Sequence, residues 1–224
     1  MTNFASGAKS KIKALVNRLT FSPLKYWEKR AKEHGEYSVL HLGHDKGEIQ
    51  KVKAFQIETI FPVLVEQLNG DEKTLLDFGC GPGRFTIELA DAIKGHAMGV
   101  DPIEHLLQLA PQGDNVSYKK IIDSTIPASD ESFDVIWICL VLGGLVSNKQ
   151  LARTVKEINR VSKDNALLIL IENTTNKKNT LSWAYRSRKE YIQLFKNFNL
   201  KHFKDYDDLG ECISIFAGRK ISPI

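Results

Sequence analysis

A glycine stands at every second position near the middle of the chain, after a short apolar segment that contains an acid. Asp77 comes first and is followed by Gly79, Gly81 and Gly83. Glycines at this spacing permit a tight turn that a ligand can approach closely, and a following helix directs amide groups at that ligand. A dinucleotide fingerprint would need glycine at position 84, which is Arg84. The motif therefore predicts a ligand site whose acid attracts a cation rather than a pyrophosphate.

Two further acids stand where later apolar segments end. Asp101 follows the second apolar segment, and Asp123 with Ser124 follows the third. If these segments are parallel strands, the acids meet at the edge of the sheet where open α/β sheets bind ligands. A carboxylate at Asp101 can accept hydrogen bonds from both hydroxyls of a ribose. The spacing favours a ligand that contains a ribose.

The elements that must position these acids are visible in the hydrophobic pattern. From residue 73 onward, nearly continuous apolar runs alternate with amphipathic segments, which is typical of a parallel sheet covered by helices on both faces. The expected strands are 74–78, 96–100, 116–122, 133–140 and 166–171, and the expected helices are 84–93, 104–110, 149–161 and 189–198. Two last strands, 200–206 and 212–217, are close enough for a hairpin.

The first seventy residues have a different pattern. Residues 9–33 place apolar side chains at helical spacing among basic ones, with a break at Ser22-Pro23, and residues 34–48 read as a polar loop. A helix is expected over about 50–68, with Pro62 inside it. The basic amphipathic start fits a helix packed on the domain, and it is also compatible with a membrane surface or a partner.

The net charge of +4 is a sum of segments with opposite charge. Residues 1–35 carry +6 and residues 176–224 carry +5, whereas residues 36–175 carry −7. The small total excludes a chain that is basic throughout, as many nucleic-acid binders are. The basic ends keep RNA or an anionic surface open as partners.

The three cysteines, Cys80, Cys139 and Cys212, have neither a disulfide framework nor a zinc-ligand spacing. We therefore expect no metal site and a cytoplasmic protein. No apolar run is long enough for a signal peptide or a transmembrane segment. The sequence does not define the oligomeric state.

Three segments together resemble the motifs of class I S-adenosylmethionine-dependent methyltransferases: the acid–glycine turn, Val100-Asp101 and Ile122-Asp123-Ser124. The resemblance covers about 73–172 closely and the later strands in outline. It implies an α/β fold, a Rossmann-like doubly wound seven-stranded sheet of order 3-2-1-4-5-7-6 with strand 7 antiparallel. An N-terminal helical cap or substrate lid, residues 1–70, would precede the methyltransferase domain, residues 71–224.

The same resemblance implies the cofactor, S-adenosylmethionine, and its product, S-adenosylhomocysteine. By this resemblance, Asp77 and the glycines of the turn would line the methionine moiety and its amino group. The acid at 101 would bind the ribose, the next two residues would flank the adenine, and the 123–124 pair would bind the adenine amino group. Two residues that leave the fourth strand would lie near the methyl group. The implied cofactor residues are Asp77, Gly79, Gly81, Gly83, Asp101, Pro102, Ile103, Asp123, Ser124, Cys139 and Leu140.

The acceptor is expected to be a small molecule, carbohydrate-related or anionic, that is methylated on oxygen or nitrogen. The stretch 26–30, with the polar loop after it, is similar to the N-terminal caps of bacterial enzymes that methylate sugars and other metabolites. Basic residues after the fifth strand could pair with an anionic group: Lys177, Lys178, Arg186, Arg188 and Lys189. The fourth strand lacks a D/N-P-P-Y signature and no Pro-Cys nucleophile is present, so DNA is disfavoured.

A general base is useful when the acceptor is a poor nucleophile. Relatives often have a histidine just after the fourth strand, where this chain has Gly143-Gly144, which would open space there. The remaining candidates are His41, His44 and Asp45 in the polar loop and Glu172 at the end of the fifth strand. Two alternatives stay open, an RNA or protein methyltransferase and a cofactor-binding scaffold without catalysis.

Overall fold

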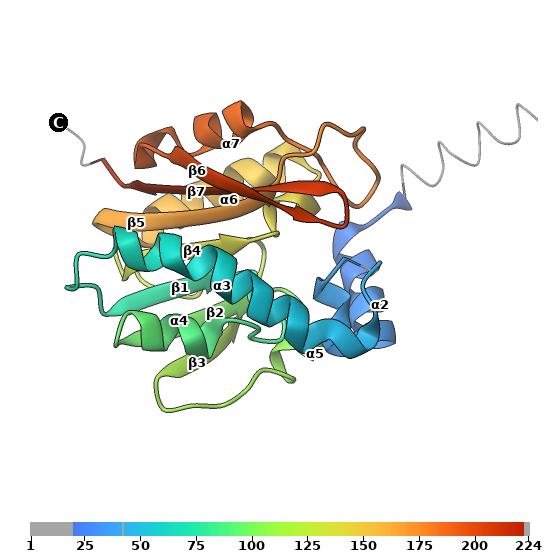
Figure 1. Cartoon of the computed structure of the whole chain (residues 1–224), viewed down its shortest axis with the longest axis horizontal. Coiled ribbons are helices and arrows are strands. Elements are labelled where there is room, and N and C mark those ends of the chain that lie inside the picture. Colours follow the sequence, from blue (N-terminus) through green and yellow to red (C-terminus); the bar gives the residue numbers. More distant parts are fainter. Residues whose placement is uncertain (1–19, 42, 222–224) are drawn as a thin grey trace, which may run out of the picture.

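Seven strands form one mixed sheet in the computed structural model, which describes residues 20–41 and 43–221 (Figure 1). The strands are β1 (Thr74–Phe78), β2 (His96–Asp101), β3 (Val116–Lys120), β4 (Phe133–Cys139), β5 (Ser162–Asn173), β6 (Lys201–Asp208) and β7 (Glu211–Arg219). Their order across the sheet is β3-β2-β1-β4-β5-β7-β6, and β7 is antiparallel to both of its neighbours. The expected fold class and strand order are confirmed.

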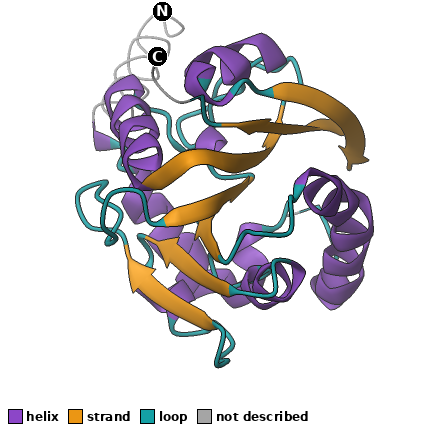
Figure 2. Cartoon of the chain, turned by 90° about the vertical axis from the view of Figure 1, so that its left-hand side faces the viewer, coloured by secondary structure: helices purple, strands orange, loops and turns teal. Residues whose placement is uncertain are grey.

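Helices cover both faces of this sheet, as Figures 1 and 2 show. They are α2 (Pro23–His34), α3 (Ile49–Gln67), α4 (Thr86–Ala92), α5 (Glu104–Leu107), α6 (Asn148–Val161) and α7 (Arg188–Leu194). Ser22, Ser147 and Ser187 cap α2, α6 and α7 by accepting a hydrogen bond from a backbone amide of the first turn. The expected 104–110 helix is shorter, and the expected 189–198 helix ends at Leu194 before a 3₁₀ turn. The amphipathic stretch before residue 20 lies outside the described residues.

Alternating residues of the central strands build two cores, one on each face. In β5, Leu167, Ile169 and Ile171 pack with α3 and α4, whereas Leu168 and Leu170 pack with α6 and α7. The helix α3 belongs to the first core through three side chains that are at most 5% exposed, Ile60, Val63 and Leu64. Residues on either side of position 70 thus share a core. The division into a cap and a methyltransferase domain remains a prediction, and α2 with the segment 35–48 is the part that lies outside the two layers.

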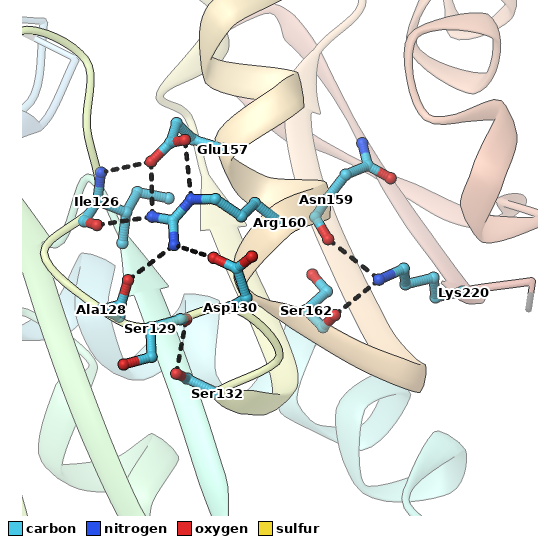
Figure 3. A network of polar contacts seen from close by, with 10 residues as sticks. All are labelled: Ile126, Ala128, Ser129, Asp130, Ser132, Glu157, Asn159, Arg160, Ser162 and Lys220. Carbon is cyan, nitrogen blue, oxygen red and sulfur yellow. Dashed lines mark hydrogen bonds and ion pairs between the residues drawn. The ribbon is translucent and has the colours of Figure 1, made fainter.

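A polar network holds the edge of the sheet at which the parallel strands begin (Figure 3). Arg160, at the end of α6, donates to both carboxylate oxygens of Glu157, to Asp130, and to the carbonyls of Ile126 and Ala128, over 2.8–2.9 Å. The carboxylate of Glu157 also accepts from the Ile126 amide. This guanidinium is fully engaged, so it fixes the loop before β4 to α6.

Candidate active site

A cavity of about 850 Å³ opens at the carboxyl ends of β1, β2 and β4. The first two residues of the glycine turn (79–83) and the 121–124 loop line it, α2 covers one side, and the first turns of α6 form another wall. Among the side chains that line it are Trp27, Glu28, Asp77, Arg84, Asp101, Ile103, Leu106, Lys120, Asp123, Ser124, Cys139, Leu140, Lys149 and Arg153. The strand-end acids predicted from the sequence therefore meet in one place.

The glycine turn requires its glycines for two reasons. Gly79, Gly81 and Gly83 have φ values of 73°, 56° and 68°, a region that other residues adopt at a cost. Their surroundings are also full, since a side-chain carbon would lie 2.5 Å from Val141 at the first position and 2.8 Å from Val39 at the second. The turn is thus packed tightly from behind, and its shape is fixed before any ligand arrives.

Asp77 is the acid at the end of β1, and it is only 4% exposed. Its carboxylate accepts a hydrogen bond from the Thr86 hydroxyl at 2.7 Å. Burial raises the pKa of Asp77 to about 7, against the opposing effects of the Thr86 hydrogen bond and the positive charge of Arg84. A carboxylate that is costly to ionise in the free protein is well suited to a cationic ligand, which would stabilise its charged form.

Asp101 ties the glycine turn to the start of α5. One carboxylate oxygen accepts from the Gly81 amide at 3.1 Å and the other from the Ile103 amide at 2.8 Å. Burial raises the pKa of Asp101 to about 6 in spite of these two hydrogen bonds. Each oxygen keeps a second lone pair, so the side chain can still accept hydrogen bonds from a ligand.

The 121–124 loop lies beside α5 at the far end of the cavity. Asp123 and Ser124 have φ values of 49° and 62°, so two consecutive residues take the left-handed conformation. Ile122 is 64% exposed although it lines the cavity. With Ile103 and Leu106 it forms an apolar wall next to the acid at 123. A flat ring that carries an amino group has suitable partners here.

The loop after β4, residues 141–145, forms a third wall and is held by hydrogen bonds from other segments. Glu172, at the end of β5, is fully buried and accepts from the amides of Val141 and Leu142 at 2.9 and 2.6 Å. Arg186 donates to the carbonyls of Leu142 and Leu145, both at 2.7 Å. An acid and an arginine thus fix the loop whose first residues line the cavity.

Two tryptophans occupy the space beside Gly143 and Gly144. A side-chain carbon on Gly143 would lie 2.2 Å from the Trp183 ring, and one on Gly144 would lie 3.2 Å from Trp27. The two indoles meet edge to face, with ring centroids 6.4 Å apart. The expectation that these glycines open space is therefore wrong, because indole rings fill it; of the two tryptophans, Trp27 lines the cavity and Trp183 does not.

The four candidate bases have other partners. His41 accepts from the Gly43 amide at 3.0 Å, His44 contacts Asp208 at 2.6 Å, and Asp45 accepts from the Gly47 amide at 2.9 Å. Of the described residues that line the cavity, none is a histidine, and Glu172 is occupied by the loop after β4. The rings of His41 and His44 meet edge to face, but none of the four side chains lines the cavity, so their role as bases stays a prediction.

Nine of the eleven predicted cofactor residues line one cavity, all except Gly81 and Gly83, and their chemistry fits S-adenosylmethionine. Acids surround the glycine turn, where the ligand would carry its ammonium and sulfonium charges, and Asp101 has free lone pairs for a ribose. Cys139 and Leu140 line the cavity at the end of β4, and burial raises the pKa of the Cys139 thiol to about 12, so this side chain is neutral. A neutral thiol beside a sulfonium acts as a small polarisable contact rather than as a nucleophile.

Several cavity residues escaped the sequence analysis. Arg84 was noted only as a break in the dinucleotide fingerprint, although its place directly after the glycine turn is a signal. Glu28 lies on α2, and Lys149 and Arg153 lie one turn apart on α6. Nothing in the local pattern of α6 says which of its faces meets the cavity. Three of the basic residues after β5 have partners elsewhere. Lys177 pairs with Glu211, Arg188 pairs with Asp205, and Arg186 donates to the loop after β4.

Within residues 20–41 and 43–221, no group of three or more His, Cys, Asp or Glu side chains is arranged to hold a metal ion. No helix in this part of the chain is long and apolar enough to cross a membrane.

Several known proteins with a similar sequence or fold are methyltransferases. Residues 75–165 match the family model of a methyltransferase domain. A demethylmenaquinone methyltransferase of Bacillus licheniformis is 27% identical over 201 residues, which cover 86% of this chain and 84% of that protein. A SAM-dependent methyltransferase from Methanosarcina mazei aligns with a TM-score of 0.60 at 20% identity, over 71% of this chain and 97% of that one. One from Aquifex aeolicus has a TM-score of 0.56 at 22% identity, over 78% and 98%. These two structures show the fold.

Proposed function

We propose that this chain, a class I S-adenosylmethionine-dependent methyltransferase, transfers a methyl group to an oxygen or nitrogen atom of an anionic small molecule. The shape of the cavity carries the proposal. Its volume, about 850 Å³, falls within the range of small-molecule sites, and α2 covers it from one side. Trp27, which packs edge to face on Trp183, lines the cavity from α2, and the remaining volume suits a cofactor and a compact acceptor rather than a folded RNA or protein.

The charges at the mouth of the cavity support an anionic acceptor. Lys149 and Arg153 are exposed on one face of α6, and neither has an ion pair among the described residues. Lys120 lines the same cavity but pairs with Glu104 at 3.3 Å. Unpaired cations at the opening can attract a carboxylate or a phosphate. The demethylmenaquinone methyltransferase, whose name gives it a small-molecule acceptor, supports the same size class.

The protein's contribution to such a reaction is positioning and exclusion of water. When bound, S-adenosylmethionine supplies an electrophilic methyl group on a sulfonium. The rigid glycine turn and the clamped 141–145 loop define where the two reactants lie, and the paired indoles of Trp27 and Trp183 keep water from that side. An acceptor that is already a good nucleophile needs little more from the protein.

A hydroxyl acceptor would also need a base. We propose Glu28 as the first candidate, because it is exposed on α2 and lines the cavity. The earlier candidates His41, His44, Asp45 and Glu172 would need a rearrangement of their present contacts. A pH profile of turnover for Glu28→Gln beside His44→Gln separates the two possibilities, since only the true base removes the acidic limb.

Turnover on paired acceptors tests the function. The full chain is incubated with S-adenosylmethionine and with phenols, amines and sugars, each in a neutral and a phosphorylated or carboxylated form, and released S-adenosylhomocysteine is measured. We expect the anionic member of a pair to react faster, with a rate that falls as salt rises. Reaction with total RNA alone, steeply salt-dependent, would favour the RNA alternative. Binding of S-adenosylhomocysteine without any turnover would favour a scaffold, and no binding would remove the cofactor from the proposal.

A further inference from the structure

Trp27, on the helix that covers the cavity, is an aromatic side chain that the proposed function uses only to exclude water. It is half-buried and lines the cavity. Among the described residues its ring contacts Tyr26, Trp183 and Arg30, and its indole nitrogen has no hydrogen-bond partner. A partly exposed tryptophan offers a ligand a large apolar surface and one N–H donor.

The protein holds this indole ring in place from more than one side. The Arg30 guanidinium lies over the ring at 5.0 Å from its centroid, and it donates to the carbonyls of Ser38 and Leu40, both at 2.6 Å. Trp183 meets the ring edge to face, with 6.4 Å between the centroids. Because these contacts fix the ring before a ligand arrives, little side-chain entropy is lost when a ligand packs against it.

The two helices that line the cavity offer a ligand different chemistry. On α2, Leu24 and Trp27 lie three positions apart and both line the cavity, and Leu24 is 46% exposed. The side chains of α6 that line the cavity are all polar or basic, and the two cations among them, Lys149 and Arg153, are exposed. A ligand that touches both helices therefore needs an apolar part for α2 and an anionic part for α6.

A flat aromatic ring suits the α2 wall better than a sugar does. The hydroxyls of a sugar would lie against Leu24 and the indole of Trp27, where the indole N–H is the one side-chain donor of the pair, and hydroxyls buried without partners cost free energy. An aromatic ring has no such cost. It also gains the offset or edge-to-face attraction between two rings, in addition to the burial of apolar surface.

We propose that the methyl acceptor is an aromatic compound with one anionic group, whose ring packs against Trp27 while its anionic group faces Lys149 and Arg153. The inference rests on the proposed function and names the substrate class of the same site. Glu28 follows Trp27 in α2 and also lines the cavity, so the surface for the ring and the candidate base belong to one helix.

Trp27 also lies close to the residues predicted to flank the adenine. A side-chain carbon on Gly144, in the loop after β4, would lie 3.2 Å from the indole nitrogen, and the ring packs against a cluster that contains Ile103 and Leu106. The adenine of the cofactor is thus a second flat ring that could contact Trp27. The experiment must separate the acceptor ring from the adenine.

Acids with and without an aromatic ring provide the first test, on the unaltered chain. Hydroxybenzoates are compared with hydroxycyclohexanecarboxylates, which keep the carboxylate and the hydroxyl but replace the flat ring by a saturated one. Each acid is titrated by calorimetry into the full chain saturated with S-adenosylhomocysteine, because binding, unlike turnover, does not depend on the greater nucleophilicity of a phenol. We expect the aromatic acids to bind roughly 5- to 10-fold more tightly.

Variants of Trp27 assign this preference to the indole. For Trp27→Leu we expect the aromatic acids to lose about 5- to 10-fold in affinity, whereas the saturated acids and S-adenosylhomocysteine stay within about 2-fold. Trp27→Phe keeps a ring and should restore the aromatic acids to within about 3-fold of the unaltered chain. Phe203→Leu, which removes an exposed ring of β6 that does not line the cavity, is the matched control and should change none of these affinities.

Each other result overturns a stated part of the argument. If the saturated acids bind as tightly as the aromatic ones, or if no aromatic acid binds the loaded chain, the proposed substrate class is wrong. Weaker binding of S-adenosylhomocysteine by folded Trp27→Leu, with unchanged affinity for the aromatic acids, would assign the ring to the adenine and would also overturn the proposal. If the unaltered chain does not bind S-adenosylhomocysteine, the proposed function itself fails. The comparison on the unaltered chain decides the substrate class even if Trp27→Leu does not fold.

Discussion

The acids at the two edges of the sheet have pKa values that are shifted in opposite directions. At the cavity edge, burial raises the pKa of Asp77 to about 7, of Asp101 to about 6 and of Glu172 to about 7. At the other edge, burial is outweighed by hydrogen bonds from Lys163 and from Lys73 and Thr74, which lower the pKa of Asp134 to about 2. Glu157, beside Arg160 at that edge, also has a lowered pKa because of its hydrogen bonds to the guanidinium.

This difference means that the acids at one edge of the sheet serve stability and those that line the cavity serve function. Acids with lowered pKa values stabilise the fold in their charged form, whereas acids with raised values destabilise it when charged. Asp77 and Asp101 line the cavity, where a cationic ligand can compensate their charge, as is common for functional sites, whereas Glu172 accepts from the amides of the loop after β4. The arginines follow the same rule, since Arg160 is fully engaged and Arg84 is not.

The largest expected effect is at the edge where the parallel strands begin, which Arg160 holds. Arg160→Met should lower the free energy of unfolding by about 3 kcal/mol, because it removes charge-assisted hydrogen bonds to Glu157 and Asp130 and leaves two loop carbonyls without their donor. Urea unfolding followed by circular dichroism measures the loss. Lys156→Met, on the exposed side of the same helix, should stay within about 0.5 kcal/mol. Weaker binding of S-adenosylhomocysteine by folded Arg160→Met would contradict the separation of the two edges.

A smaller loss is expected for Asp134→Asn, about 2 kcal/mol at pH 7. Its carboxylate accepts from the backbone amides of Lys73 and Thr74 and from Lys163, and an amide side chain cannot keep the charged part of these interactions. Because the folded-state pKa is lowered, this stability is present above about pH 4 and is lost as the pH falls toward 2. The variant and the unaltered protein should therefore converge in acid unfolding curves, and a constant difference down to pH 2 would count against the assignment.

Asp77→Asn should act in the opposite direction. The folded-state pKa of Asp77 is raised, so its charge destabilises the free protein above about pH 7, and this penalty disappears as the pH falls toward 4. Asn can still accept from the Thr86 hydroxyl, so we expect a gain of about 1 kcal/mol at pH 8 and none at pH 4. S-adenosylhomocysteine should bind about 10-fold more weakly to the variant at pH 8. Its affinity for the unaltered chain should fall as the pH drops through about 7, and that dependence should be lost in Asp77→Asn.

The cavity edge was also the part that could be predicted from the sequence. Asp77 with the three glycines, Asp101 and Asp123 each stand at a strand end, and strand ends are readable from local hydrophobic pattern and turn residues. The strand order was predicted from the family resemblance. The expected terminal hairpin fits the last two strands of that sheet, because strand 7 is antiparallel. Helix ends were less predictable, as α5 shows.

The acceptor side could not be predicted, because it is assembled from distant segments. Trp27 and Trp183 are 156 positions apart in the chain, yet they meet over Gly143 and Gly144. No local pattern indicates that a glycine pair leaves room for an indole rather than for a ligand. Arg186 is similar, since a basic residue in a loop gives no sign that its partners are the carbonyls of another loop.

The smallest expected effect concerns the cations at the mouth of the cavity. Lys149→Gln and Arg153→Gln should each raise the KM for an anionic acceptor by about 3-fold, because exposed charges contribute little and are screened by salt. The effect should shrink above about 0.5 M NaCl, and the neutral member of the same acceptor pair should show no change. Since neither side chain has an ion pair among the described residues, the melting temperature should not move. If the variants lost stability without a change in KM, Lys149 and Arg153 would stabilise the fold as Arg160 does. The contrast between cations that have protein partners and cations that do not would then not extend to α6.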